Sequence, residues 1–155
     1  MHAAREVTLA ATPADLWALL WDVPRMVACV PGCVEATEVE PHRRYRARMT
    51  QKVGPISLSV PLDIQIVAAE PSQRLALDAR GRDPIVGAEV AMRVSLEIAE
   101  AAPGSVLRID AEGRVLGKLG ALGHGVIQRK AEEALAEFAD RLRHAVEPHA
   151  RPAPA

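Results

Sequence analysis

The sequence is short of aromatic side chains, and this shortage restricts what its interior can be made of. Phe, Trp and Tyr together make up 3% of the 155 residues, although 49% of the residues are hydrophobic. The core must therefore be filled by Ala, Val, Leu, Ile and Met, which can pack an interior to full density. A cavity between such side chains would have an aliphatic wall.

Net charge and long apolar runs are missing as well. The formal net charge is −1, so there is no general electrostatic attraction toward nucleic acid. No uncharged run approaches the roughly 20 residues that a transmembrane helix needs. The first ten residues lack the apolar core of a signal peptide. We therefore expect one cytoplasmic domain without a nucleic-acid partner.

Cysteine is also scarce: Cys29 and Cys33 are the only two, and they flank the turn sequence Val30-Pro31-Gly32. A structural zinc site needs four ligands, usually as two close pairs, and the five histidines are scattered along the chain. Redox motifs place two residues between the cysteines, whereas three stand here. We predict a tight turn without a metal, in which the thiols act as small apolar side chains. Such cysteines fit a reducing cytoplasm.

Two short helices are predicted near the N-terminus, after a strand at residues 5–10. Thr12 suits the N-cap of the first helix, and Pro13 suits its first helical position. Pro24 follows a break in that helix, and a second helix is predicted at residues 24–29.

Five later segments alternate apolar and polar side chains, which is typical of strands with one buried and one solvated face. Turns rich in Pro and Gly separate these segments, so the pattern predicts an antiparallel meander. The five segments are residues 45–53, 58–66, 75–79, 88–98 and 107–115.

The last predicted element is a long amphipathic helix over residues 120–146. Apolar side chains recur along it at three- and four-residue steps, and charged ones occupy the other faces. Residues 148–155 are rich in Pro and Ala, so we expect a disordered tail there. Residues 1–147 therefore form one α+β domain, with a curved antiparallel sheet of about six to seven strands, two short helices after the first strand and a long C-terminal helix.

Three stretches resemble a known family: WALLWDVPRMVACVPGC at 17–33, KVGPI at 52–56 and GKLGALGHGVI at 117–127. Together with the order of elements, they resemble the carbon monoxide dehydrogenase CoxG family of the START-like (SRPBCC), helix-grip superfamily. The likeness covers residues 3–146. It implies a helix-grip fold, in which the curved sheet wraps around the long C-terminal helix.

The resemblance also implies a non-catalytic accessory role, without a covalently bound cofactor. Such a protein associates with a molybdenum hydroxylase of the carbon monoxide dehydrogenase type and holds a lipid-like ligand, such as a quinone, in the helix-grip cavity. It would help to couple the enzyme to the membrane. Family members often continue through a linker into a hydrophobic anchor, whereas this sequence stops at Ala155. We therefore expect only peripheral contact with the inner face of the cytoplasmic membrane.

A ligand held between the sheet and the long helix would be lined by apolar side chains. Burying a long isoprenoid or acyl chain at roughly 25 cal/mol per Å² would give useful affinity without any hydrogen bond. Ordinary core packing explains the same positions, so both interpretations stay open. The predicted lining consists of Met26, Val30, Met49, Leu62, Ile64, Leu77, Val90, Met92, Leu119, Leu122, Gly123, Val126 and Ile127.

The glycines at the start of the long helix also allow two interpretations. Each glycine weakens a helix by roughly 0.8–1 kcal/mol relative to alanine, which would let the first turns lift to admit a ligand. Close packing of a strand against the helix requires glycine equally well. The glycines concerned are Gly117, Gly120, Gly123 and Gly125.

The basic side chains Arg44, Arg46, Arg48 and Lys52 share the outer side of one strand. Such a face can dock onto anionic lipid or onto an acidic partner. It can also be a solvated face that is neutralised by neighbouring acids, such as Asp63 on the adjacent strand.

Two further functions are alternatives to a carrier. A small helix-grip enzyme acting on a hydrophobic cyclic substrate would need an inward polar group with a tuned pKa. The inward candidates are Tyr45, Gln51 and Lys130, without a Ser/His/Asp set or paired carboxylates, so we predict no catalytic residues. A purely protein-binding module without a cavity is the other alternative.

Overall fold

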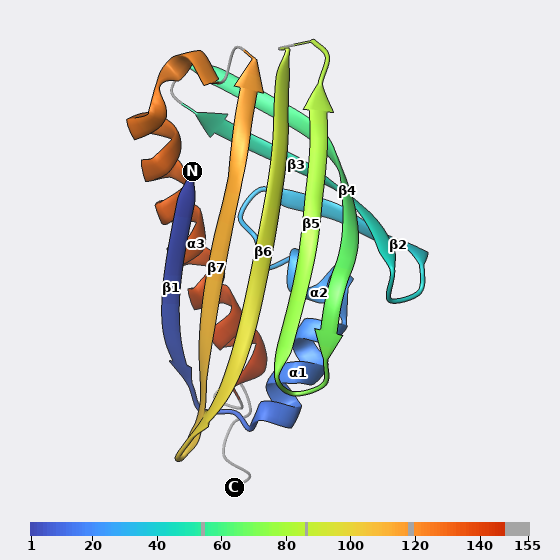
Figure 1. The fold of residues 1–155 in the computed structure, drawn as a ribbon, viewed down its shortest axis with the longest axis vertical. Helices are drawn as coiled ribbons and strands as arrows, with labels where there is room; N and C mark the ends of the chain where they lie inside the picture. Colours follow the sequence, from blue (N-terminus) through green and yellow to red (C-terminus); the bar gives the residue numbers. More distant parts are fainter. Residues whose placement is uncertain (54, 86, 118–119, 148–155) are drawn as a thin grey trace, which may run out of the picture.

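The computed structural model describes residues 1–53, 55–85, 87–117 and 120–147 (Figure 1). Within these residues, seven strands form one antiparallel sheet in the order β1-β7-β6-β5-β4-β3-β2. The sheet curves, and the long C-terminal helix α3 lies along it beside β1 (Figure 1). The predicted α+β architecture, a curved antiparallel sheet with a long C-terminal helix, is confirmed. Residues 148–155, the predicted tail, lie outside the described residues.

The elements follow the predicted order, with one additional strand after the cysteine turn. In chain order they are β1 (His2–Leu9), α1 (Pro13–Trp21), α2 (Val23–Val27), β2 (Cys33–Glu40), β3 (Arg44–Val53), β4 (Ile56–Glu70), β5 (Arg74–Asp83), β6 (Ala88–Ala101), β7 (Gly104–Gly117), the 3₁₀ turn η1 (Gly120–Leu122) and α3 (His124–Val146).

Helix α1 begins where its sequence predicts. The Thr12 hydroxyl accepts a hydrogen bond from the Asp15 backbone N–H at 3.1 Å, so it satisfies one of the unpaired donors of the first turn. Stacked rings then tie α1 to the turn between β2 and β3. Trp17 and Trp21 stack with their centroids 5.4 Å apart, and Trp21 stacks on His42 at 4.2 Å.

The alternation predicted for the strands corresponds to the burial observed. In β3 and β4 the paired side chains Tyr45 and Ile64 are buried, as are Ala47 and Leu62. Strand β2 has no such alternation, because it is the far edge of the sheet and its side chains are mostly exposed. Its pairing with β3 is also interrupted by two register shifts. These features explain why periodicity did not identify it.

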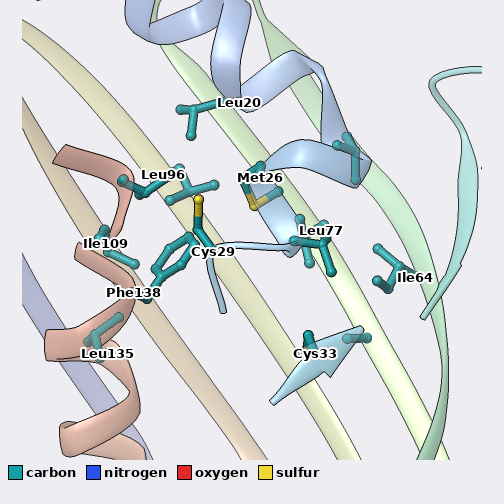
Figure 2. Close-up of a cluster of buried hydrophobic side chains, with 14 of the residues drawn as sticks. Leu20, Met26, Cys29, Cys33, Ile64, Leu77, Leu96, Ile109, Leu135 and Phe138 are labelled. Carbon is teal, nitrogen blue, oxygen red and sulfur yellow. The ribbon is translucent and has the colours of Figure 1, made fainter. Parts of the chain in front are cut away.

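The core lies between the sheet and the second half of α3. Figure 2 shows Leu135 and Phe138 of α3 pointing toward Leu96 of β6 and Ile109 of β7, with Cys29 beside them. All five side chains are buried. As predicted, the core is filled almost entirely by aliphatic side chains.

Helix α3 starts four residues later than the predicted range of 120–146. Gly123 has a φ of +95°, which is a left-handed conformation that ends the short turn η1 before α3 begins at His124. The second short helix spans Val23–Val27 instead of 24–29, a shift within the usual uncertainty of helix ends. Among the described helices, none combines the length and the apolar character needed to cross a membrane.

A candidate ligand groove between the sheet and helix α3

One long side of α3 is fastened to the edge strand β1. The Gln128 side-chain amide donates to the His2 carbonyl at 2.5 Å and accepts from the His2 N–H at 3.2 Å. Nineteen residues further on, the Glu147 carboxylate accepts from the Ala10 N–H at 2.6 Å. The bonded backbone groups belong to His2 at the start of β1 and to Ala10 just after its end, so α3 is held near both of its ends.

The other long side of α3 faces an open groove. The groove has a volume of about 460 Å³, within the range of small-molecule sites. Strands β3 and β4 form the wall opposite the helix, and the cysteine turn contributes a further part. Its lining consists of Pro31, Gly32, Thr50, Gln51, Lys52, Ser57, Leu58, Lys130, Glu133, Ala134 and Glu137.

Hydrogen bonds to β3 hold the cysteine turn in place as a wall of the groove. The Gly32 carbonyl accepts from the Thr50 N–H at 2.8 Å, and the Gln51 side-chain amide donates to the Pro31 carbonyl. Gly32 has a φ of +82°, and a Cβ there would lie 2.2 Å from the Thr50 carbonyl oxygen. Only glycine meets both conditions. The Pro-Gly pair is therefore explained by close packing and hydrogen bonding of the turn against β3.

The two cysteines are buried free thiols. Burial raises the pKa of Cys33 to about 11. Burial also raises the pKa of Cys29, against the opposing effect of Arg25 and Arg141. Because the thiolate is the reactive and metal-binding form, these shifts favour inert apolar side chains. Within the described part of the chain, no three His, Cys, Asp or Glu residues are grouped so as to hold a metal ion.

The charged groups of the groove are two lysines and two glutamates. Glu137 accepts a hydrogen bond from Arg141 at 2.6 Å. Lys130 is half-buried, and its ammonium forms no ion pair or hydrogen bond with a described residue. Lys52 and Glu133 also line the groove and are exposed to solvent.

The structure divides the predicted apolar lining into several groups, and none of these residues lines the groove. Met26, Leu62, Ile64 and Leu77 share the buried core cluster, and Val90 is buried on β6. Val30, Met49, Met92, Leu122 and Ile127 are half-buried, whereas Gly123 and Val126 are exposed. Leu119 lies outside the described residues. As a ligand-contact set, these residues remain a prediction.

Two groove residues had a signal in the sequence. Gln51 interrupts the apolar face of β3, and Lys130 stands at the edge of the apolar stripe of α3; both are among the inward polar candidates. Pro31, Gly32 and Ser57 could not be found from periodicity, because they approach Lys130 only through the fold. Glu133 lies one helical turn after Lys130, so its proximity to Lys130 follows from the helix alone.

The glycines before and within α3 differ in their surroundings. A Cβ on Gly117 would lie 1.7 Å from the Gly87 carbonyl oxygen, and one on Gly120 would lie 2.9 Å from that of Val115, so close packing explains these two. Around Gly123 and Gly125 a Cβ would meet nothing within 4 Å. Close packing therefore does not account for the last two glycines.

Acidic neighbours neutralise part of the basic face of β3. Arg44 donates to both carboxylate oxygens of Asp63, at 3.2 and 3.1 Å, as the solvated interpretation requires. Arg48 pairs with Glu35 across to β2 at 3.3 Å. For these two arginines the structure favours a solvated, internally neutralised face.

Comparisons with solved structures define the class of protein. The chain is similar to a conserved protein from Geobacillus kaustophilus, with a TM-score of 0.82 at 16% identity over 94% of this chain and 95% of the other. It is also similar to a START superfamily protein from Mycobacterium smegmatis, with a TM-score of 0.71 at 12% identity over 94% and 96%. At such identities the likeness establishes the fold alone: a START-like domain.

The sequence then identifies the family. Residues 6–147 match the CoxG family, which is named for a subunit of carbon monoxide dehydrogenase, and the chain belongs to this family. Comparison with curated proteins gives no significant match.

Proposed function

We propose that this protein is a non-catalytic accessory protein of a molybdenum hydroxylase of the carbon monoxide dehydrogenase type. It binds a lipid-like ligand, such as a quinone, between the sheet and α3, and it contacts the inner face of the cytoplasmic membrane peripherally. The observation that carries the proposal is membership of a family named for a subunit of an oxidoreductase, on a START-like fold. By carrying such a ligand between the enzyme and the membrane, the protein would couple the two.

The way α3 is attached supports entry of a ligand from one side. Gln128 and Glu147 fasten the helix to β1, whereas its contact with β3 is slight. Lifting α3 away from β3 and β4 would leave the attachment to β1 intact. Such a movement would open the interior beside the groove without breaking the sheet.

The distribution of perturbed acids supports binding over catalysis. Arg93 lowers the pKa of Asp78 through hydrogen bonds, and Arg108 does the same for Asp110. Both carboxylates alternate with buried neighbours such as Leu77 and Ile109, so they lie on the outer face of the sheet. Their shifts are those of surface ion pairs and do not indicate a general acid or base beside the groove.

Ligand analysis of the purified protein tests the proposal. Native mass spectrometry and organic extraction should reveal a bound lipid or quinone after expression in a quinone-producing cell. Isothermal titration with decylubiquinone should then give saturable binding to the emptied protein. An empty protein that also fails to bind the added quinone would overturn the carrier role.

A groove-filling variant makes this test specific. Ala134→Trp places an indole in the groove and should reduce decylubiquinone binding at least about tenfold. Arg129→Trp adds the same side chain at an exposed position of the same helix, outside the groove, and should leave binding unchanged. Association is tested separately by gel filtration with a purified three-subunit molybdenum hydroxylase, where separate elution would contradict the accessory role.

A further inference from the structure

We propose that the groove between α3 and strands β3 and β4 binds the polar head of an amphipathic ligand, that this head is uncharged and carries hydrogen-bond-accepting oxygens, and that Lys130 is its main donor. The inference rests on the proposed function and specifies the ligand class and its orientation. The head lies at the groove and the apolar tail extends into the interior between the sheet and α3.

Lys130 is available as a donor at a half-buried position of α3. Lys130 lines the groove, is half-buried and has no hydrogen bond or ion pair with any described residue. Hydrogen bonds from a charged donor are roughly twice as strong as neutral ones. A carbonyl or hydroxyl oxygen placed in the groove would therefore gain most from Lys130.

Neutral polar side chains line the wall of the groove opposite α3. The Gln51 amide is held by its hydrogen bond to the Pro31 carbonyl, which keeps that side chain in one position. The Ser57 hydroxyl on β4 is a second neutral group in the lining, able to donate or accept. Such groups orient a neutral head without adding charge.

The charge of the groove argues against an anionic head. Its two lysines, Lys52 and Lys130, are balanced by Glu133 and Glu137, so the formal charge of the lining is zero. A phosphate in the groove would approach two carboxylates as well as two ammonium groups. A neutral oxygen acceptor takes the hydrogen bond of Lys130 without that repulsion.

The apolar part of the lining indicates where the tail goes. Leu58 on β4 and Ala134 on α3 line the groove at its apolar positions. The inner face of β4 continues from Leu58 through Val60, Leu62 and Ile64, all buried. A tail that follows this face would reach side chains of the predicted apolar lining, once α3 moves aside.

Three probes with an apolar part and different polar groups separate the possibilities. Decylubiquinone has a neutral head with carbonyl oxygens, dodecyl phosphate has an anionic head, and N-phenyl-1-naphthylamine has no oxygen. We expect decylubiquinone to bind at least about tenfold more tightly than dodecyl phosphate. Lys130→Met should weaken decylubiquinone about tenfold or more and leave the naphthylamine unchanged.

Two control variants guard this test against effects on folding. Arg129→Met removes a neighbouring exposed cation outside the groove and should change none of the three affinities. Lys130→Arg retains a charged donor and should restore most of the lost affinity. Circular dichroism and urea unfolding establish that each variant is folded.

The outcomes distinguish the inference from the proposed function. Equal affinities of the Lys130→Met and Arg129→Met variants for decylubiquinone would overturn the head-group site, while binding itself would still support the carrier. Tighter binding of dodecyl phosphate than of decylubiquinone would overturn the neutral head. If none of the probes binds the unmodified protein, the proposed function fails first.

Discussion

The two halves of α3 differ in how firmly they belong to the fold. In the C-terminal half, Leu135, Phe138, Ala139 and Leu142 are buried. Arg25 of α2 also donates to the Ala145 carbonyl at 3.1 Å, which satisfies an acceptor near the helix end. In the N-terminal half, Val126 is 39% exposed, and Gly125 has open space around it. One continuous helix thus combines a half that is packed into the core with a half that is loosely packed and held by the hydrogen bonds of Gln128 to β1.

This difference explains how a helix can both close a domain and admit a ligand. Stability is not uniform within a protein, and segments with few buried apolar contacts open at lower free-energy cost. The N-terminal half has few such contacts and borders the groove at Lys130. The C-terminal half can remain in the core while the N-terminal half lifts away from β3, still attached to β1 through Gln128.

Truncation of one apolar side chain in each half should reveal the largest difference. Phe138→Ala should lower the free energy of unfolding by about 3–5 kcal/mol, because it leaves a cavity in the core. Val126→Ala should change it by less than about 0.5 kcal/mol, since Val126 is outside the buried core and alanine favours helix. Urea unfolding followed by circular dichroism measures both. Comparable losses in the two variants would contradict the division of α3.

Removing the attachment to β1 should have the next largest effect. Gln128→Ala deletes both hydrogen bonds to His2, and we expect a loss of about 1 kcal/mol. Arg129→Ala, at an exposed neighbour, should be close to neutral. Hydrogen exchange should show faster exchange at the His2 amide in the first variant only. If the two variants exchange alike, the attachment contributes nothing measurable.

Stiffening the loose half should have a smaller effect of opposite sign. Gly125→Ala should stabilise the protein by about 0.5–1 kcal/mol, because the position is helical and an added Cβ meets no neighbour. Slower hydrogen exchange over residues 124–130, together with slower quinone uptake in stopped flow, would support a lifting helix start. A destabilised variant would instead favour close packing at this glycine.

The smallest effect is expected far from α3, at the ion pair between Asp78 and Arg93. Arg93 holds the pKa of Asp78 below its usual value of 3.8. The pair therefore stabilises the protein fully at pH values above about 4 and loses this contribution as the pH falls through the lowered pKa. Asp78→Asn should make the free energy of unfolding depend slightly less on pH in the acid range, as measured by urea unfolding at several pH values. Quinone affinity should not change, and a change would contradict the assignment of the binding region.

The sequence predicted the fold where burial and periodicity coincide. Alternation identified the inner faces of β3 and β4, and the Thr12 cap located the start of α1. It did not identify β2, which is an exposed edge strand without alternation. Nor did it locate the start of α3, because Gly123 could have stood inside a helix and is left-handed in the structure.

The candidate groove was only partly accessible from the sequence. Gln51 and Lys130 were noticeable because each is polar beside apolar neighbours. The role of Pro31 and Gly32 could not be noticed in the sequence, since their partners Thr50 and Gln51 come from a strand about 20 residues away.

The sequence by itself determined what depends on neighbours along the chain: strand faces, the first helix cap, the amphipathic stripe of α3 and the family. The tertiary structure alone decided which half of that stripe is buried and where the groove opens. The reason is that burial depends on contacts between distant segments, such as Gln128 with His2, 126 positions apart. A periodic pattern records that a helix has an apolar face, but the elements packed against it decide how much of that face is covered.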